Sequence, residues 1–153
     1  MAFLRCDLGS VSTDHHTLAM LLGPDSGYVH SAYQVADLDE VAAGAEFLHD
    51  NGYHHSWGIG RHIHGSQIFD YWRDPDGLMF EHYTDGDLFD ASVESGWAPM
   101  SASRLGQWGP KATRDFLGTG SPATVVAAVK ALRKSGNDID LATLRGLIKA
   151  MAS

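Results

Sequence analysis

Residues 28–35 alternate between two kinds of side chain, which is the period of a β-strand. His30, Ala32 and Gln34 share one face, and the residues between them form a mostly apolar opposite face. A polar face opposite an apolar one predicts a strand that lines a cavity. A helix is expected directly afterwards, because Asp37 can cap its start and apolar residues follow at helical spacing.

Three more strands are predicted after this helix, at 54–57, 66–72 and 78–83, with turn residues at 74–77 between the last two. Residues 28–84 therefore form one β-α-β-β-β unit. Short apolar runs at 2–6 and 17–22, separated by a turn-rich stretch, predict two paired strands. We interpret residues 2–22 as the end of a preceding unit of the same kind, so the expected fold class is α+β with one complete and one partial unit.

The composition changes after residue 90. Residues 91–120 are rich in Gly, Pro, Ser and Trp and predict an irregular arm. Residues 121–153 carry two apolar stripes at helical spacing, separated by Gly136, and predict a helical hairpin. We expect three segments: 1–90, the arm 91–120 and the hairpin 121–153.

Composition and charge restrict the kind of function. A chain of 153 residues with 44% apolar and 20% charged residues is typical of a single globular domain. The net charge of −8 argues against nucleic acid or an anionic membrane as a partner. There is no apolar run near the membrane-spanning length of about 18 residues and no signal-peptide pattern, so a cytoplasmic location is expected.

The balance of cysteine and histidine indicates which metals the chain can hold. A single cysteine, Cys6, excludes an internal disulfide framework and a thiolate cluster. Nine histidines leave nitrogen and oxygen as the metal ligands, which suits iron(II), manganese or zinc.

The segment 60–81 carries three groups suited to hold a small ligand beside a metal ion: the imidazole of His62, the phenol of Tyr71 and the carboxylate of Glu81. His30 precedes Glu81 by 51 positions, so only the fold can bring them together. Two histidines and one carboxylate on one face of iron(II) leave open positions for a bidentate substrate and dioxygen. His30 and Glu81 are candidates for two of those three ligands.

Each candidate also has a purely structural explanation. His30 on its own would more often be a hydrogen-bonded, half-buried histidine, and Glu81 could be a surface carboxylate. Tyr71 could be core packing and His62 could be solvent-exposed. Arg61 could be a surface charge or could neutralise an anionic substrate tail.

Four motifs, in order and spacing, resemble the type I extradiol ring-cleavage dioxygenases of the vicinal oxygen chelate superfamily, glyoxalase-like in fold. They are Asp14-His15-His16-Thr17-Leu18-Ala19, Tyr28-Val29-His30, Gly60-Arg61-His62, and Phe69-x-Tyr71-x-x-Asp74-Pro75-x-Gly77-x-x-x-Glu81. The resemblance covers residues 1–90 closely and the arm loosely. It implies that residues 1–90 are part of a catalytic domain, resembling the C-terminal half of such a domain.

The resemblance implies roles for individual residues. His30 and Glu81 would be metal ligands to Fe(II), with Mn(II) as the alternative. His16 would be an acid/base group beside the oxygen species, although its neighbour His15 could take that place. His62 and Tyr71 would contact the oxygens of a catecholic substrate. The expected reaction is ring cleavage of a catechol, including biphenyl-like diols, by dioxygen.

The resemblance also exposes a departure. The family's third ligand is a histidine that would lie before Met1. Either a complementary chain supplies the missing part, or the chain is a truncated relative of the family. In a homo-oligomer, another copy could place His54, His55 or His64 at the vacant position. The alternatives are a module that binds aromatic ligands or assembles without catalysis, and an isomerase-type chemistry, which the His62 and Tyr71 pair disfavours.

Overall fold

The computed structural model describes residues 1–21, 26–98 and 105–118, together with the single positions 126, 130 and 145. The hairpin expected at 121–153 lies almost wholly outside these residues. None of the helices in the described part of the chain is long and apolar enough to cross a membrane.

Helix α1 (Leu38–Asp50) begins where the sequence predicts it. The Asp37 carboxylate accepts a hydrogen bond from the Glu40 backbone N–H at 3.0 Å, and the Glu40 carboxylate accepts one from the Ala36 N–H at 2.7 Å. This reciprocal capping satisfies two amide groups that the first turn of a helix leaves without partners. Gly52, at φ +73°, follows the end of the helix and turns the chain toward the sheet.

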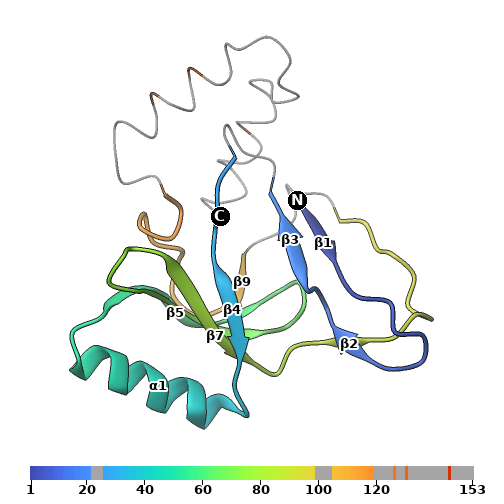
Figure 1. Cartoon of the computed structure of the whole chain (residues 1–153), viewed down its shortest axis with the longest axis horizontal. Coiled ribbons are helices and arrows are strands. Elements are labelled where there is room, and N and C mark those ends of the chain that lie inside the picture. Colours follow the sequence, from blue (N-terminus) through green and yellow to red (C-terminus); the bar gives the residue numbers. More distant parts are fainter. Residues whose placement is uncertain (22–25, 99–104, 119–125, 127–129, 131–144, 146–153) are drawn as a thin grey trace.

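The main sheet has five strands in the order β4-β7-β6-β5-β9 (Figure 1). They are β4 (Ser31–Gln34), β5 (His54–His62), β6 (Ile68–Arg73), β7 (Met79–Thr84) and β9 (Gly106–Trp108). β4 runs parallel to β7, and the other neighbours are antiparallel. The predicted β-α-β-β-β unit at 28–84 is confirmed, and β9 adds a strand that the sequence analysis did not predict.

The two faces of this sheet carry different side chains. α1 packs on the face that carries His82, because a Cβ added at Gly44 of the helix would lie 3.0 Å from the His82 ring. Successive side chains of a strand point to opposite faces, so Glu81, next to His82, lies on the face away from α1. That second face holds the buried aromatic core of Trp57, Phe69 and Tyr71.

The arm expected to be irregular covers this aromatic core. Phe116 packs on Trp57 and Tyr71, with ring centroids 4.4 and 4.8 Å away. The Trp57 indole N–H donates to the Pro110 carbonyl at 2.8 Å. Asp115 accepts hydrogen bonds from the Ser56 hydroxyl and the Arg73 guanidinium, at 2.6 and 2.9 Å from its Oδ2. Residues 105–118 are therefore an integral part of the wall on this side of the sheet.

The N-terminal residues lie beside the main sheet (Figure 1). β1 (Ala2–Leu4) and β3 (Leu18–Met20) form the predicted antiparallel pair. β2 (Thr13–Asp14) pairs with β8 (Leu88–Phe89), which follows the main unit in the chain. This second pairing fastens the N-terminal segment to the end of the β-α-β-β-β unit.

Candidate metal and substrate site

Strand register brings His30, Tyr71 and Glu81 to one face of the sheet. Tyr71 lies directly opposite Glu81 on the neighbouring strand. Ala32 is the partner of Glu81 on β4, and His30 precedes Ala32 by two positions, which places both on the same face. The His30 Nε2 atom lies 3.1 Å from Glu81 Oε2. The two residues that are 51 positions apart in sequence are therefore in direct contact.

His62, at the end of β5, completes the same cluster. Its Nε2 atom lies 2.9 Å from the Tyr71 hydroxyl and 3.9 Å from Glu81 Oε1. Its other ring nitrogen, Nδ1, lies 2.9 Å from the Leu105 carbonyl oxygen. Burial lowers the pKa of His62, and the nearby Glu81 carboxylate partly opposes that shift.

Tyr71 is held rigidly in this cluster. It is buried, its ring lies nearly parallel to Trp57 at 5.6 Å, and its hydroxyl also hydrogen-bonds to Glu81. Burial raises the pKa of Tyr71 well above its usual value, and the Glu81 charge adds to the effect. The phenol therefore stays protonated at neutral pH and can donate a hydrogen bond.

His16 faces the same cluster from the N-terminal segment. Burial lowers the pKa of His16 to about 4, and His15, Glu81, His30 and His62 also act on it. The His15 and His16 Nδ1 atoms are 2.9 Å apart, so one of the two must carry the proton that they share. The ring of Phe3 packs on His16 at a centroid distance of 4.6 Å. A neutral imidazole at this position can accept a proton.

The donor set for a metal ion is incomplete in the described part of the chain. His30 Nε2 and Glu81 converge from adjacent strands, but the described residues contain no group of three His, Cys, Asp or Glu side chains arranged to hold an ion. The buried Nδ1 atom of His30 has no hydrogen-bond partner in the structure. The two residues expected as metal ligands lie together, and no third candidate ligand joins them among the described residues.

Two of the three substitute histidines, His54 and His55, have partners outside the cluster. His55 Nε2 lies 2.7 Å from the Asp70 carboxylate, on the face of the sheet covered by α1. His54 lies 3.5 Å from Asp115. His64 lies close enough to His62 and His15 to lower the pKa of both. Within one copy of the chain, His54 and His55 therefore do not join His30 and Glu81.

Arg61 is not directed at a substrate. Its guanidinium donates to the Ser66 carbonyl and to the Asp85 carboxylate, both at 2.6 Å. These bonds close the loop between β5 and β6 against the end of β7. Of the two explanations given for Arg61, the structure supports the surface ion pair.

Sequence reasoning missed the contribution of the arm. The Leu105 carbonyl and the Phe116 ring contact His62 and Tyr71 directly. A backbone carbonyl has no signature in the sequence, and β9 is too short to show a strand period. The glycines at 106 and 109, beside Trp108, were the available signal.

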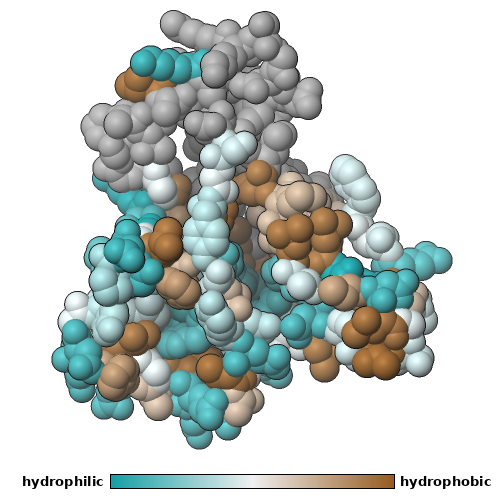
Figure 2. All heavy atoms as spheres, in the orientation of Figure 1, coloured by the Kyte–Doolittle hydropathy of each residue, from teal (hydrophilic) through white to brown (hydrophobic). Residues whose placement is uncertain are grey.

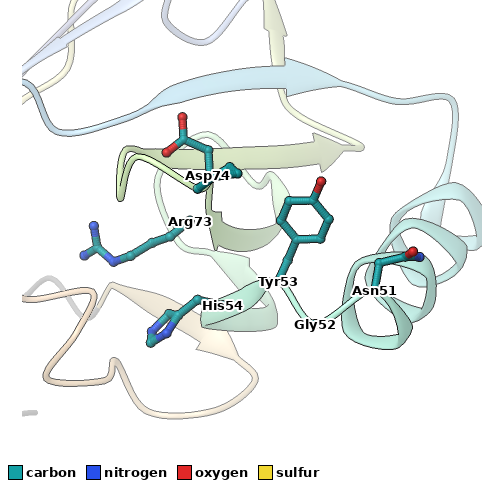
Figure 3. Close-up of a pocket in the computed structure, with 7 residues that line it drawn as sticks. Asn51, Gly52, Tyr53, His54, Arg73 and Asp74 are labelled. Atoms are coloured by element: carbon teal, nitrogen blue, oxygen red, sulfur yellow. The ribbon is translucent and has the colours of Figure 1, made fainter.

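A surface hollow in the described part of the chain lies away from this cluster. It has a volume of about 350 Å³ and is formed where α1 ends, β5 begins and β6 ends (Figure 3). Its lining includes Tyr53, His54, Arg73 and Asp74. The Arg73 guanidinium is committed to Asp115 and to the Gly77 carbonyl, so this hollow does not offer a free cation. We place the functional site at the His30, His62, Tyr71 and Glu81 cluster, where the chemistry converges.

Comparisons with known proteins show what the whole chain is similar to. Metapyrocatechase 2 of Cupriavidus necator is 37% identical to the chain over 118 residues. The 2,3-dioxygenase LapB from Pseudomonas sp. KL28 aligns with a TM-score of 0.52 at 23% identity, and a catechol 2,3-dioxygenase with a TM-score of 0.50 at 16%. At these identities the solved structures show the shared fold. The chain is therefore similar in sequence to part of Metapyrocatechase 2 and shares the fold of these two solved dioxygenases.

The chain spans about a third of the length of these relatives. The match to Metapyrocatechase 2 covers 76% of the chain and 36% of the relative. The match to LapB covers 56% of the chain and 30% of LapB, and the match to the catechol 2,3-dioxygenase covers 67% and 34%. No family model matches the chain.

Proposed function

We propose that the chain forms the substrate-binding side of an extradiol dioxygenase that cleaves a catechol-type ring with dioxygen at a non-haem Fe(II) ion. The observation that supports it most is the convergence of His30, His62, Tyr71 and Glu81 on one sheet face. This set offers two metal donors next to an imidazole and a phenol, and it matches the likeness to Metapyrocatechase 2.

The His30 Nε2 atom and the Glu81 carboxylate would hold the metal, Fe(II) or alternatively Mn(II). Their donor atoms are 3.1 Å apart, which is close to the spacing of neighbouring ligands around one ion. When bound, such an ion acts as a Lewis acid that brings the catechol and dioxygen together. The third protein ligand would come from a complementary chain or from a second copy of this one.

The chain's own residues would handle the protons of the substrate. The Nε2 atom of His62 would accept a proton from one catechol hydroxyl. Tyr71, which stays protonated because burial raises its pKa, would donate a hydrogen bond to a substrate oxygen. His16, with a pKa near 4, would act as the second proton acceptor on the opposite side. Trp57, Phe69 and Phe116 would exclude water behind Tyr71.

An activity assay tests this proposal. The purified chain, loaded anaerobically with Fe(II), is mixed with 2,3-dihydroxybiphenyl or catechol in air, and the yellow ring-opened product is followed by absorbance. We expect activity to require added partner chain or self-association, and His62→Gln to lower it by roughly 10²–10⁴-fold, because a positioned acid/base group contributes about that much. His49→Ala, at an exposed helix position, should leave it unchanged. Oxygen uptake that His62→Gln does not affect would contradict the proposal.

The second candidate function is a non-catalytic module that binds aromatic ligands or assembles with another chain. The lack of a three-ligand group among the described residues favours it. In that case a catechol would bind and quench the fluorescence of Trp57, with no oxygen uptake under any mixing condition. Turnover by the chain would exclude this candidate.

A further inference from the structure

The Leu105 carbonyl lies on the side of His62 away from the cluster, 2.9 Å from Nδ1. A carbonyl oxygen can only accept a hydrogen bond, so this contact requires a proton on Nδ1. We propose that the Leu105 carbonyl is a positioning group that fixes the tautomer of His62, and so leaves Nε2 as a hydrogen-bond acceptor toward a ligand. The proposal rests on the function proposed above and adds a part of the arm to the site.

The tautomer of His62 matters because its Nε2 atom points toward the cluster. Nε2 lies 2.9 Å from the Tyr71 hydroxyl and 3.9 Å from Glu81. In a neutral imidazole only one nitrogen carries a proton, so a proton on Nδ1 leaves a lone pair on Nε2. The Tyr71 hydroxyl has a single proton, and in this tautomer it donates that proton to Nε2 rather than to Glu81. That lone pair faces the cluster, where a catechol hydroxyl would enter. With the opposite tautomer, Nε2 would present a proton instead and could not accept one.

Close backbone packing holds the Leu105 carbonyl in place. β9 pairs with the end of β5, with Trp108 opposite Arg61 and Gly106 opposite His62. The two strands approach through glycines: a Cβ added at Gly109 would lie 2.6 Å from the Gly60 Cα and 2.8 Å from the Ile59 carbonyl oxygen. Gly109 also has φ +114°, which other residues rarely adopt. The position of the carbonyl therefore depends on this contact between glycines.

Nuclear magnetic resonance of the imidazole nitrogens tests the proposal on the full chain, without metal or substrate. The ¹⁵N shifts and long-range couplings identify the protonated nitrogen at pH 8, and His62→Gln assigns the signals by removing them. We expect neutral His62 to carry its proton on Nδ1. A wild-type His62 protonated on Nε2 overturns the proposal directly, whatever the variants do.

Gly109→Ala should undock β9 and shift the tautomer ratio toward Nε2–H by about tenfold, the equivalent of one lost hydrogen bond. Gly96→Ala is the matched control, because a Cβ at Gly96 meets no atom within 4 Å. Since Gly109→Ala can also impair folding, a second variant replaces Gly106 by glycolic acid. This turns the Leu105 carbonyl into a weaker-accepting ester carbonyl and keeps every side chain, and the same replacement at Gly96 is its control.

A merely structural role for β9 would change stability and leave the tautomer as it was. The ester carbonyl still accepts a hydrogen bond, but more weakly, so we expect a lower ratio of Nδ1–H to Nε2–H in the folded ester variant. A ratio equal to that of the Gly96 ester control would overturn the proposal. The tautomer is measured without turnover, so its failure is distinguishable from failure of the proposed function. If His62 carries its proton on Nδ1 and no ring cleavage occurs, the proposed role of the Leu105 carbonyl stands and the proposed dioxygenase function fails.

Discussion

Among single residues, Asp70 matters most for the geometry of the site, because it lies on the opposite face of the strand that carries Tyr71. It is fully buried on the helix-facing side of β6, next to Tyr71 in sequence. Its carboxylate accepts hydrogen bonds from the His55 and His82 imidazoles, at 2.7 and 2.9 Å, and from the Trp72 indole. His82 is also its partner across β6 and β7. The same two strands, one residue along, carry the Tyr71 and Glu81 pair, so Asp70 stabilises the register of the site.

Asp70→Ala should lower the free energy of unfolding by roughly 3–5 kcal/mol, because it leaves the largely buried Trp72 and His82 donors without their acceptor. Asp50→Ala, at an exposed position at the end of α1, should change it by less than about 0.5 kcal/mol. Urea denaturation followed by tryptophan fluorescence measures both. Equal stabilities for the two variants would show that the Asp70 network does not hold the strands.

His16 should stay neutral down to about pH 4, because burial opposes its charged form. The unfolded chain binds this proton near pH 6.5, so the unfolded state holds more protons between pH 4 and 6.5. The His16 contribution therefore makes the folded state less stable as the pH falls through this window. Proton NMR of the imidazole and the stability of His16→Gln check it: the variant should lose less stability in acid. A His16 resonance that titrates near 6.5 contradicts the account.

At the scale of elements, the contact between β5 and β6 depends on Gly58. Gly58 has φ +147°, and a Cβ there would lie 2.2 Å from the Asp70 carboxylate and 2.8 Å from the Asp70 Cα. β5 changes register against β6 immediately after this residue. The irregular register therefore lets Asp70 lie against β5 at Gly58, where only a glycine fits.

Gly58→Ala should destabilise the fold by roughly 2–4 kcal/mol, because a methyl group there meets buried backbone and a carboxylate. Gly52→Ala should cost only about 1 kcal/mol, because its φ of +73° is strained for alanine but a Cβ meets no atom within 4 Å. Thermal unfolding of the two variants measures the difference. If Gly52→Ala proved the more damaging change, the crowding at Gly58 would not be the controlling contact.

The elements that the sequence predicts are those with local signals. α1 carries its capping pair within five residues, and β4, β5, β6 and β7 are separated by turn residues or by the helix. β2, β8 and β9 have two or three residues each and exist because distant segments pair. Such pairing has no local period, so the sequence predicts neither these strands nor the wall that the arm forms.

At the scale of the whole molecule, the N-terminal ribbon and the edge of the main sheet expose apolar side chains. The ribbon of β1 and β3 leaves Phe3, Leu4, Leu18 and Met20 about 39–53% exposed. Figure 2 shows brown, apolar surface over this part of the molecule. β4 ends the sheet order and pairs on one side only within the described residues, and Tyr33 on it is 59% exposed. Unpaired edges and apolar patches favour association.

The 153-residue chain should therefore associate in solution, with a mass above that of the 16.5 kDa monomer. Light scattering over a tenfold concentration range measures it. Tyr33→Lys should lower the associated fraction, because a charge on the exposed edge strand opposes strand addition, whereas Glu46→Lys on the helix surface should not. A clean monomer at every concentration would contradict this expectation.

The sequence predicts those residues of the candidate site that belong to spaced motifs. His30, His62, Tyr71 and Glu81 come from three separated motifs. They lie together because strand register pairs β4, β5, β6 and β7 as the β-α-β-β-β unit requires. The Leu105 carbonyl was not predictable, since a backbone atom leaves no mark on residue identity.

Anaerobic Fe(II) binding to the chain and to Glu81→Gln tests the central claim most directly. Glu81→Gln keeps the shape of the side chain and removes a ligand charge, and Glu46→Gln on the surface of α1 is the matched control. The account predicts a bound ion for the chain and for Glu46→Gln, and at least a tenfold weaker affinity for Glu81→Gln, about the cost of one metal-site change. Equal iron content in all three proteins, by elemental analysis after desalting, would contradict it.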